Sequence, residues 1–268
     1  MGICKVCGLE KRISKILGVC IDCIREKPEV SLSYIKNVHE NVRKNFNLPC
    51  YPPKTINGIE CNICENRCKI GIGEKTYCGL RENENGILKS KSDSEKCVCD
   101  CYYDYIPTNC CASWFCNAAK KGKNLYNLAV FFYGCSFNCL FCQNYSHKFV
   151  EEGPIFSLEQ LLKIANNESV YCICFFGGSP EPQLPFVIRF SEEILKKKKI
   201  RICFEWNGNG NENLVMKVGE IAYKSSGIIK FDLKAFDENL NIALTGVSNK
   251  KTYQNFKLIA KEFLSKSD

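Results

Sequence analysis

The sequence predicts an α/β fold with a parallel sheet, preceded by small cysteine-rich segments that bind metal. Two observations lead to this prediction. From Leu125 onward, short apolar runs alternate with helical stretches, and most of the cysteines before this point stand in closely spaced groups. Runs as apolar as these are typical of parallel strands, which are covered on both faces. We therefore expect four parts, at residues 1–27, 28–53, 54–124 and 125–268.

Cysteine usage narrows the chemical class. The 268 residues include 21 cysteines but only two histidines, His39 and His147. No apolar run approaches the roughly 20 residues that cross a bilayer, and the first ten residues contain no signal-type apolar block, so we expect a cytoplasmic protein with no membrane partner. In a reducing cytosol, closely spaced cysteines indicate metal ligation, and the shortage of histidine disfavours Ser-His-Asp hydrolysis.

The formal net charge of +8 would by itself suggest a nucleic-acid partner. A Cys4 zinc site contributes about −2, and a [4Fe–4S] core held by three thiolates contributes about −1. Two such zinc sites and one such cluster lower the net charge to about +3. Because the basic excess is largely offset in this way, we do not expect nucleic acid as a partner.

Residues 1–27 contain two CxxC pairs separated by twelve residues. Pairs at this distance suit a tetrahedral ion, because each tight turn supplies two sulfurs. The segment is therefore predicted to be a zinc-ribbon-like site, with a redox cluster and plain core cysteines as the alternatives. The expected ligands are Cys4, Cys7, Cys20 and Cys23.

Residues 28–53 are predicted to form a helix and a linker. From Pro28 to Asn47 an apolar residue recurs at every fourth position, which indicates an amphipathic helix with one packing face. The linker follows because Pro49, Pro52 and Pro53 end the helix. The predicted packing face consists of Val30, Tyr34, Val38, Val42 and Phe46.

Residues 54–124 form a cysteine-rich extension. A second set of four cysteines lies in a short segment with little apolar sequence, which folds more readily around a metal than without one; the set is Cys61, Cys64, Cys68 and Cys78. Zinc or an auxiliary iron–sulfur cluster fits this set, and the spacing does not choose between them.

Six further cysteines of the extension alternate with aromatic residues. They are Cys97, Cys99, Cys101, Cys110, Cys111 and Cys116. We interpret this stretch as an apolar layer over a neighbouring domain rather than as a base-stacking surface, because arginine and lysine do not flank the aromatic residues. Some of the thiols suit another metal site, but the sequence does not identify which four.

Residues 125–268 are predicted to form the α/β core. The expected strands are Leu128–Tyr133, Val170–Phe176, Ile200–Phe204 and Ile228–Phe231. A capping box at 157–160 begins one helix, two more pass through 186–195 and 214–221, and the last two cover 239–244 and 252–264. Three cysteines inside the strands, Cys172, Cys174 and Cys203, are predicted to be small core residues.

Each predicted strand ends in a glycine or polar motif. The motifs are Gly134-Cys135, Gly177-Gly178-Ser179-Pro180, Glu205-Trp206-Asn207-Gly208 and Asp232-Leu233-Lys234. Ligands of parallel α/β folds bind at the carboxyl ends of the strands, so the four motifs are expected to meet at one site.

The most specific motif is a CxxxCxxC loop formed by Cys135, Cys139 and Cys142. Three thiolates from one loop can hold three irons of a [4Fe–4S] cube, which leaves the fourth iron open to a ligand that is not protein. Zinc would need a further ligand, and His147 is the only histidine near enough in sequence.

With these motifs the sequence resembles the radical S-adenosylmethionine (SAM) superfamily, and within it the activating enzymes of pyruvate formate-lyase and their archaeal relatives. The resemblance covers about Leu125 to Leu264. It implies a (β/α) barrel with a [4Fe–4S] cluster and SAM as cofactors. That barrel has six strands, whereas only four are legible here, so the sequence predicts a partial, truncated barrel. Either another chain or the N-terminal part closes the sheet, or this reading frame is shortened and inactive.

The resemblance implies roles for residues that match the family motifs. The three loop cysteines would bind the cluster, and SAM would occupy the open iron. Phe141 would lie near the adenine, Gly177 and Gly178 near the methionine end, and Asn207 would hydrogen-bond SAM. Asp232 and Lys234 would lie near the sulfonium and the substrate as catalytic residues, with a structural ion pair as the alternative. Ser179 stands where the family motif Gly-Gly-Glu-Pro has glutamate, and Glu181-Pro182 follows.

The implied function is reductive cleavage of SAM to a 5′-deoxyadenosyl radical, which then acts on a protein or peptide, with a glycyl radical as one expected product. An electron donor such as ferredoxin or flavodoxin would be a partner. The alternative is a non-catalytic metal-bound module, either a zinc-ribbon binding protein or an iron–sulfur electron carrier. The strand-end motifs favour the enzyme, because a carrier needs no SAM pocket.

Overall fold

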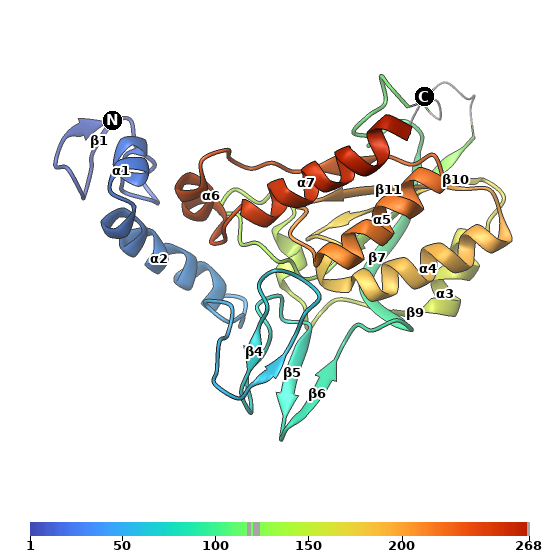
Figure 1. Ribbon diagram of the computed structural model, residues 1–268, viewed down its shortest axis with the longest axis horizontal. Coiled ribbons are helices and arrows are strands. Elements are labelled where there is room, and N and C mark those ends of the chain that lie inside the picture. The colour runs from blue at the N-terminus through green and yellow to red at the C-terminus, as the bar shows by residue number, and fades with distance from the viewer. Residues whose placement is uncertain (117–118, 120–123, 267–268) are drawn as a thin grey trace.

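A six-stranded sheet organises the chain (Figure 1). The computed structural model describes residues 1–116, 119 and 124–266, so small parts of the predicted extension and core, at 117–118, 120–123 and 267–268, lie outside the described residues. The strand order is β12-β11-β10-β8-β7-β9. The predicted α/β class with a parallel sheet is confirmed.

Four neighbouring strands of the sheet, from the edge strand β12 to β8, run parallel and match the four predicted from the sequence. Their alternate residues face opposite sides of the sheet, and one side is fully buried: Ile173, Phe175, Ile202 and Phe204 have no exposed surface. The bounds are β8 (Tyr126–Phe132), β10 (Val170–Gly177), β11 (Arg201–Trp206) and β12 (Ile229–Phe231).

Two strands extend the sheet beyond β8. Strand β7 (Lys96–Tyr105) runs antiparallel to β8, and β9 (Ile155–Ser157) pairs with the start of β7. No fifth strand was legible after Asp232, and the N-terminal part was one expected source of further strands; β7 comes from upstream of the CxxxCxxC loop and extends the sheet. Cys97, Cys99 and Cys101 stand at alternate positions of β7, and Cys97 and Cys99 face the buried side of the sheet.

Four helices cover the buried face of the sheet: α3 (Leu158–Ala165), α4 (Leu184–Lys197), α5 (Glu212–Lys224) and α7 (Lys250–Phe263) (Figure 1). The predicted capping box at the start of α3 is confirmed, because Ser157 Oγ accepts from Gln160 N at 3.2 Å and Gln160 Oε1 accepts from Ser157 N at 2.8 Å. Helix α7 is tied to the loop after β11, since Asn255 Nδ2 donates to the carbonyl of Gly208 at 2.7 Å.

The N-terminal segment is a separate small layer that packs on helix α6 (Glu238–Thr245) (Figure 1). It contains β1 (Gly2–Ile3), β2 (Glu10–Lys11), α1 (Ile21–Glu26) and α2 (Pro28–Lys44). A small apolar cluster joins the layers, with Ile24 and Ile35 on one side and Ala243 on the other.

Helix α2 forms as predicted but buries a different face. Val30 and Tyr34 of the predicted packing face are 51% and 42% exposed. The buried residues are instead Ser31, Ile35, His39 and Arg43, one position further along the helix. Three of these four are polar, so hydrophobic periodicity could not identify the face; their burial depends on hydrogen bonds such as Ser31 Oγ to the carbonyl of Cys23 at 2.7 Å.

The segment between α2 and β7 consists of short hairpins. They are β3 (Ile59–Glu60) with β4 (Lys69–Ile70), and β5 (Arg81–Glu84) with β6 (Ile87–Ser90). The 3-10 turns are η2 (Tyr145–Lys148), η3 (Glu181–Gln183) and η4 (Leu264–Lys266).

The stretch predicted to be an apolar layer differs from that expectation. Trp114 and Phe115 are 81% and 74% exposed, and Tyr102, Tyr103 and Tyr105 are also exposed. The tyrosines belong to strand β7, so their spacing reflects a strand rather than a covering layer. Among the described residues, no helix has the length and apolar character needed to cross a membrane.

Candidate active site and metal centres

A cavity of about 290 Å³ lies at the carboxyl ends of the parallel strands. Strands β8, β10, β11 and β12 all end at this edge of the sheet, so the predicted motifs meet there. All ten residues predicted for the cluster and for SAM line this cavity: Cys135, Cys139, Cys142, Phe141, Gly177, Gly178, Ser179, Asn207, Asp232 and Lys234.

Backbone hydrogen bonds from helix α6 hold the CxxxCxxC loop. The amide of Asn138 donates to the carbonyl of Thr245 at 2.7 Å, and the amide of Leu140 donates to the carbonyl of Leu244 at 2.9 Å. These carbonyls belong to the last turn of α6, where helix carbonyls have no partner within the helix. The fold therefore fixes the loop without help from a metal.

The sulfur of Cys135 is the most enclosed of the three. It is 8% exposed, and it accepts hydrogen bonds from the amide of Phe137 at 3.4 Å and from Asn207 Nδ2 at 3.6 Å. Burial raises the pKa of the Cys135 thiol well above its usual value. Donors aimed at a sulfur favour its thiolate form, which is the form that binds iron.

Two lysines add positive charge near this loop. Burial raises the pKa of Cys139 to about 11, whereas Lys234 and Lys148 act to lower it. Lys148 is 3% exposed, and burial lowers its pKa. A thiolate-bound cluster carries net negative charge, so these cations suit a cluster better than they suit three neutral thiols.

The glycine pair after β10 is required by packing. Gly177 has φ +109°, and a Cβ there would lie 2.6 Å from the amide nitrogen of Phe132. A Cβ on Gly178 would lie 2.3 Å from the carbonyl oxygen of Gly134 and 2.8 Å from the His147 ring. The close approach of neighbouring backbone and of the His147 ring thus requires glycine at both positions, independently of any ligand in the cavity.

Ser179 stands at the position that holds glutamate in the family motif, and a glutamate, Glu181, follows two residues later. Ser179 lines the cavity, whereas Glu181 is fully buried behind it and accepts hydrogen bonds from Ser179 Oγ and from the amide of Gly208. Asn207 Nδ2 donates to Ser179 Oγ at 3.1 Å and to Ser136 Oγ at 3.0 Å. Burial raises the pKa of Glu181 to about 7, which disfavours its charged form.

Asp232 and Lys234 form an ion pair that also faces the cavity. Lys234 Nζ donates to Asp232 Oδ2 at 2.8 Å, and Lys230 Nζ lies 3.1 Å from Asp232 Oδ1. Burial acts to raise the pKa of Asp232, but the two lysines outweigh it and hold this pKa below its usual value. Lys234 Nζ also lies 5.9 Å from the ring centroid of Phe141, which is 55% exposed.

Several cavity residues were not predicted. Lys230 lies two residues before Asp232, and residues two apart on a strand face the same side of the sheet. This alternation could have predicted that Lys230 lines the cavity. Its Nζ lies 3.2 Å from Oε2 of Glu205. His147 reaches the cavity from the turn after the loop. Its Nδ1 is buried and, among the described residues, has no hydrogen-bond partner, while burial lowers its pKa to about 3.

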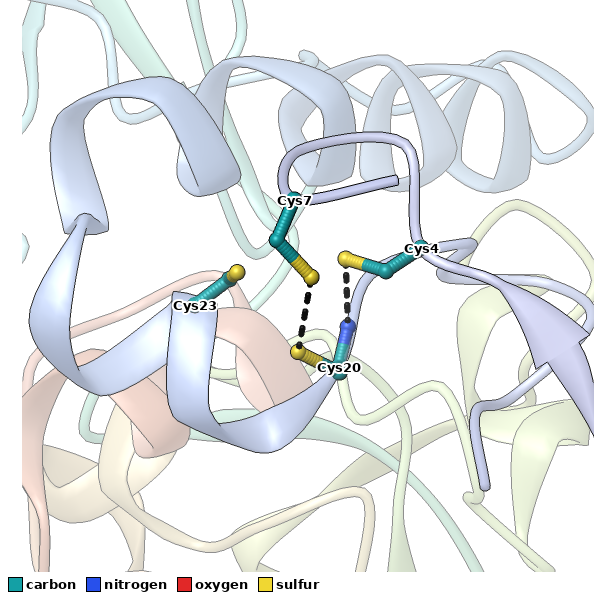
Figure 2. A group of neighbouring side chains, drawn as sticks. All are labelled: Cys4, Cys7, Cys20 and Cys23. Carbon is teal, nitrogen blue, oxygen red and sulfur yellow. Dashed lines mark hydrogen bonds between the residues drawn. The ribbon is translucent and has the colours of Figure 1, made fainter. Parts of the chain in front are cut away.

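The N-terminal cysteines form a second centre, in which all four sulfurs point towards one another (Figure 2). They lie within 4.8 Å of one another, with Cys7 Sγ and Cys20 Sγ 4.0 Å apart. Tetrahedral zinc at about 2.3 Å from each sulfur would separate the sulfurs by about 3.8 Å. Cys4, Cys7, Cys20 and Cys23 therefore suit a single tetrahedral ion.

Hydrogen bonds prepare this set for a metal. The Cys4 sulfur accepts from the amide of Cys20 at 3.3 Å. Burial acts to raise the pKa of Cys4, but backbone hydrogen bonds from Cys7, Cys20 and Val6 lower it to about 6. Burial raises the pKa of Cys23 to about 12, and the neighbouring thiols add to the increase. A lowered pKa at Cys4 favours its thiolate form, which is the form that binds a metal ion.

The third predicted set is buried but less tightly gathered. Cys61, Cys64, Cys68 and Cys78 are each at most 8% exposed, and the amide of Tyr77 donates to the Cys68 sulfur at 3.4 Å. In the part of the chain that the structure describes, only the N-terminal four cysteines lie close enough together for a single ion. Zinc or an auxiliary cluster at this third set stays a prediction.

Comparison with known families gives one match over the core of the chain. A family model described as the radical SAM superfamily matches residues 129–267, which includes the CxxxCxxC loop and all four strand-end motifs.

Curated proteins of Methanocaldococcus jannaschii are similar to parts of the chain. The uncharacterized protein MJ0674 is 25% identical over 203 residues, which are 72% of this chain and 56% of that protein. MJ1632, named as a glycyl-radical enzyme activating enzyme, is 31% identical over 136 residues, or 48% of each chain. The uncharacterized protein MJ0808 is 32% identical over 90 residues, 34% of this chain and 24% of that protein. The chain thus spans between a quarter and just over half of the length of these relatives.

Proposed function

The chain belongs to the radical SAM superfamily, and we propose that it is an iron–sulfur enzyme that cleaves SAM reductively to form a 5′-deoxyadenosyl radical. The observation that carries this proposal is the cavity at the carboxyl ends of the strands, where three cysteines of one loop meet polar groups from three other strand ends. A metal site that served only to stabilise the fold would not need those polar groups.

Cys135, Cys139 and Cys142 would hold three irons of a [4Fe–4S] cluster, and SAM would bind the fourth iron through its amino and carboxylate groups. The donor set supports this assignment, because three sulfurs face the cavity without a fourth protein thiol among its lining residues. Asn207 and Lys148 support the thiolate forms, the first by a hydrogen bond and the second by charge.

The bound cluster and SAM would supply the electron transfer and the radical that takes a hydrogen atom from the substrate. The residues of the chain would hold the reacting groups in place and keep competing groups away. Ser179 offers a hydroxyl where the family motif Gly-Gly-Glu-Pro has a carboxylate, so we infer that it binds the methionine end of SAM. The Asp232–Lys234 pair would orient the ribose or the substrate, and half-exposed Phe141 would cover the adenine.

We further propose a protein or peptide as the substrate, with a glycyl radical as its product. The name of MJ1632 supports this step, because 136 residues of the chain, 48% of its length, are 31% identical to that protein. A ferredoxin or flavodoxin would reduce the cluster. Zinc would occupy the N-terminal four-cysteine site, where the close packing of the sulfurs supports a single ion.

Anaerobic reconstitution tests the proposal. The chain is incubated with iron and sulfide, reduced with dithionite and given SAM, and 5′-deoxyadenosine is measured by liquid chromatography. We expect 5′-deoxyadenosine from the wild type and none from the triple variant C135A/C139A/C142A. If the wild type carries the cluster and still forms no 5′-deoxyadenosine, the enzyme proposal fails, and an iron–sulfur carrier or zinc-bound module replaces it.

A further inference from the structure

Asn207 directly follows strand β11 and lines the active-site cavity, although it is only 4% exposed. The resemblance to the family implies that its side chain hydrogen-bonds SAM. Its hydrogen bonds within the chain indicate a different role, because they occupy both ends of the side-chain amide.

The acceptor end of this side chain is fully used. Oδ1 of Asn207 accepts from the backbone amide of Asn209 at 2.9 Å and from Ser136 Oγ at 3.1 Å. A carbonyl oxygen has two lone pairs, so neither is left for a ligand. The bond from Asn209 also fixes which way the side-chain amide points. A backbone N–H can only donate, so it faces Oδ1, and Nδ2 lies on the other side.

The donor end of the side chain faces a cysteine sulfur and two hydroxyls. Nδ2 of Asn207 lies 3.0 Å from Ser136 Oγ, 3.1 Å from Ser179 Oγ and 3.6 Å from Cys135 Sγ. Nδ2 carries two hydrogens, and these three acceptors already surround it. A hydrogen bond to SAM would therefore require Asn207 to give up one of its present partners.

The backbone of Asn207 is held in place as well. Its amide donates to Ser179 Oγ at 3.4 Å, and its carbonyl accepts from Thr252 Oγ1 of helix α7 at 2.8 Å. Asn255 of the same helix donates to the next carbonyl, that of Gly208, at 2.7 Å. Asn207 thus meets the cluster loop as a fixed group, because helix α7 and the segment after β10 both hold its backbone.

The hydrogen-bond donors near the three loop sulfurs are concentrated on Cys135. Its sulfur accepts from Asn207 Nδ2 and also from the amide of Phe137 at 3.4 Å. In the part of the chain that the structure describes, the sulfurs of Cys139 and Cys142 accept no hydrogen bond. Asn207 therefore supplies one of the two N–H groups aimed at a loop sulfur, and it is the one that comes from outside the loop.

We propose that Asn207 is a positioning residue of the cluster, whose side-chain N–H holds Cys135 and raises the reduction potential of a cluster bound there. Reduction adds one electron to the cluster from an external donor such as dithionite, flavodoxin or ferredoxin, and no proton or bond moves at Asn207. An N–H aimed at a cluster sulfur stabilises the added negative charge, and hydrogen bonds to the sulfurs are among the factors that set such potentials. The inference rests on the proposed function only for the presence of the cluster.

A redox titration followed by electron paramagnetic resonance tests the proposal. The wild type and Asn207→Ala are reconstituted anaerobically without SAM, and iron and sulfide per chain are measured to confirm equal loading. At a fixed applied potential we expect Asn207→Ala to show an about tenfold lower ratio of reduced to oxidised cluster, which is a potential about 59 mV more negative for a one-electron couple. An unchanged potential in Asn207→Ala would overturn the proposal.

The matched control is Ser136→Ala. Ser136 contacts the same side-chain amide from within the cluster loop, and its removal leaves Nδ2 of Asn207 facing Cys135. Ser136→Ala should not lower the potential. An equal fall in this control would show that disturbance of the loop, rather than loss of the N–H donor, changes the potential, and would also overturn the proposal.

This test is separate from that of the proposed function, because neither SAM nor turnover enters it. A chain that forms no 5′-deoxyadenosine but shows the expected shift in Asn207→Ala would support this inference while the proposed function fails. A wild type that takes up no iron–sulfur cluster would overturn both.

A measurement on the wild type covers the case in which Asn207→Ala does not keep its cluster. The chain is made with ¹⁵N only in the side-chain amides of asparagine, the cluster is reduced, and pulsed electron paramagnetic resonance detects ¹⁵N coupled to it. We expect such a coupling in the wild type and its loss in Asn207→Asp, which keeps the shape of the side chain but lacks the nitrogen. No ¹⁵N coupling in the wild type, or the same coupling in Asn207→Asp, would contradict the proposal.

Discussion

The four cysteines of the N-terminal segment turn their sulfurs towards one another (Figure 2). The three cysteines of the loop after β8 instead line the wall of a cavity. The difference lies in what holds each group. The first lies among two-residue strands, a six-residue helix and a small apolar cluster, to which helix α2 contributes Ile35. Around the second, backbone hydrogen bonds from helix α6 fix the loop.

This comparison separates two uses of a metal. A segment with little core of its own gains folding free energy from a closed four-ligand site. A loop that the protein already holds does not need a closed site, so a metal bound there can keep a position free for a ligand. Helix α6 connects the two, because α1 and α2 pack on it and its last carbonyls accept from the loop.

Substitution of a loop cysteine should have the largest effect. We expect Cys139→Ala to reduce 5′-deoxyadenosine to background, because one iron loses its only protein ligand. The melting temperature should change little, since Cys139 is only partly buried and the loop keeps its hydrogen bonds to α6. Thermal unfolding and 5′-deoxyadenosine assays check the two halves of this prediction. A variant that unfolds would show that the metal, rather than the protein, holds the loop.

Substitution in the N-terminal set should unfold a segment and lower activity only in part. We expect Cys20→Ser to lose one zinc ion per chain and to speed hydrogen exchange over residues 1–44. Activity should fall about tenfold, which is the size of effect seen when a group that orients a metal ligand is removed. Mass spectrometry of zinc content and of exchange provides the measurement, with Cys50→Ser as control. Unchanged exchange in Cys20→Ser would mean that the segment folds without its metal.

His39 on α2 joins the two regions directly. Its Nε2 lies 3.0 Å from the carbonyl oxygen of Ala243, and its Nδ1 lies 2.9 Å from Nδ2 of Asn138 in the cluster loop. We expect His39→Ala to lower the free energy of unfolding by about 2–4 kcal/mol, because two buried partners are left unpaired. It should also release cluster iron faster on exposure to a chelator.

Urea denaturation and iron-release rates measure the effect of His39→Ala. The control is Val30→Ala, an exposed position on the same helix, which should change stability by no more than about 0.5 kcal/mol. Equal iron-release rates in the wild type and His39→Ala would show that His39 does not couple the N-terminal segment to the cluster loop.

The smallest effect concerns Glu181, whose pKa burial raises from 4.5 to about 7. Above about pH 4.5 the unfolded chain has released this proton while the folded chain retains it, so stability falls as the pH rises towards 7. Glu181→Gln stays neutral, and its advantage should grow over this interval to on the order of 1–3 kcal/mol and then level off. Urea denaturation at several pH values measures it, with exposed Glu192→Gln as control. An advantage that does not vary with pH would contradict the prediction.

The sequence predicted those parts of the molecule that depend on local periodicity and on short spacing. The apolar runs around Leu128 and Ile173 became parallel strands, and parallel strands bring their carboxyl ends together, so the motifs at Cys135, Gly177 and Asp232 line one cavity. The capping box at Ser157 was predictable because it is a contact between neighbours in sequence.

Contacts between distant segments could not be predicted in this way. Strand β7 pairs with β8, so that Cys101 lies opposite Val130, which is 29 residues later in the chain. No local pattern in the sequence identifies this partner. Helix α2 buries His39 rather than Val30, because its partners Asn138 and Ala243 lie about 100 and 204 residues away. Cys172 and Cys203 alternate with the buried residues Ile173 and Ile202, so their place on the face opposite the helices likewise depends on which side the helices cover.

The most direct test of the account is whether the loop leaves one iron of its cluster to SAM. The cluster is prepared with ⁵⁷Fe only at its labile site, and Mössbauer spectra are recorded with and without SAM. We expect the spectrum of that single iron to change when SAM is added, because the amino and carboxylate groups of SAM become its ligands. A spectrum unchanged by SAM would contradict the account.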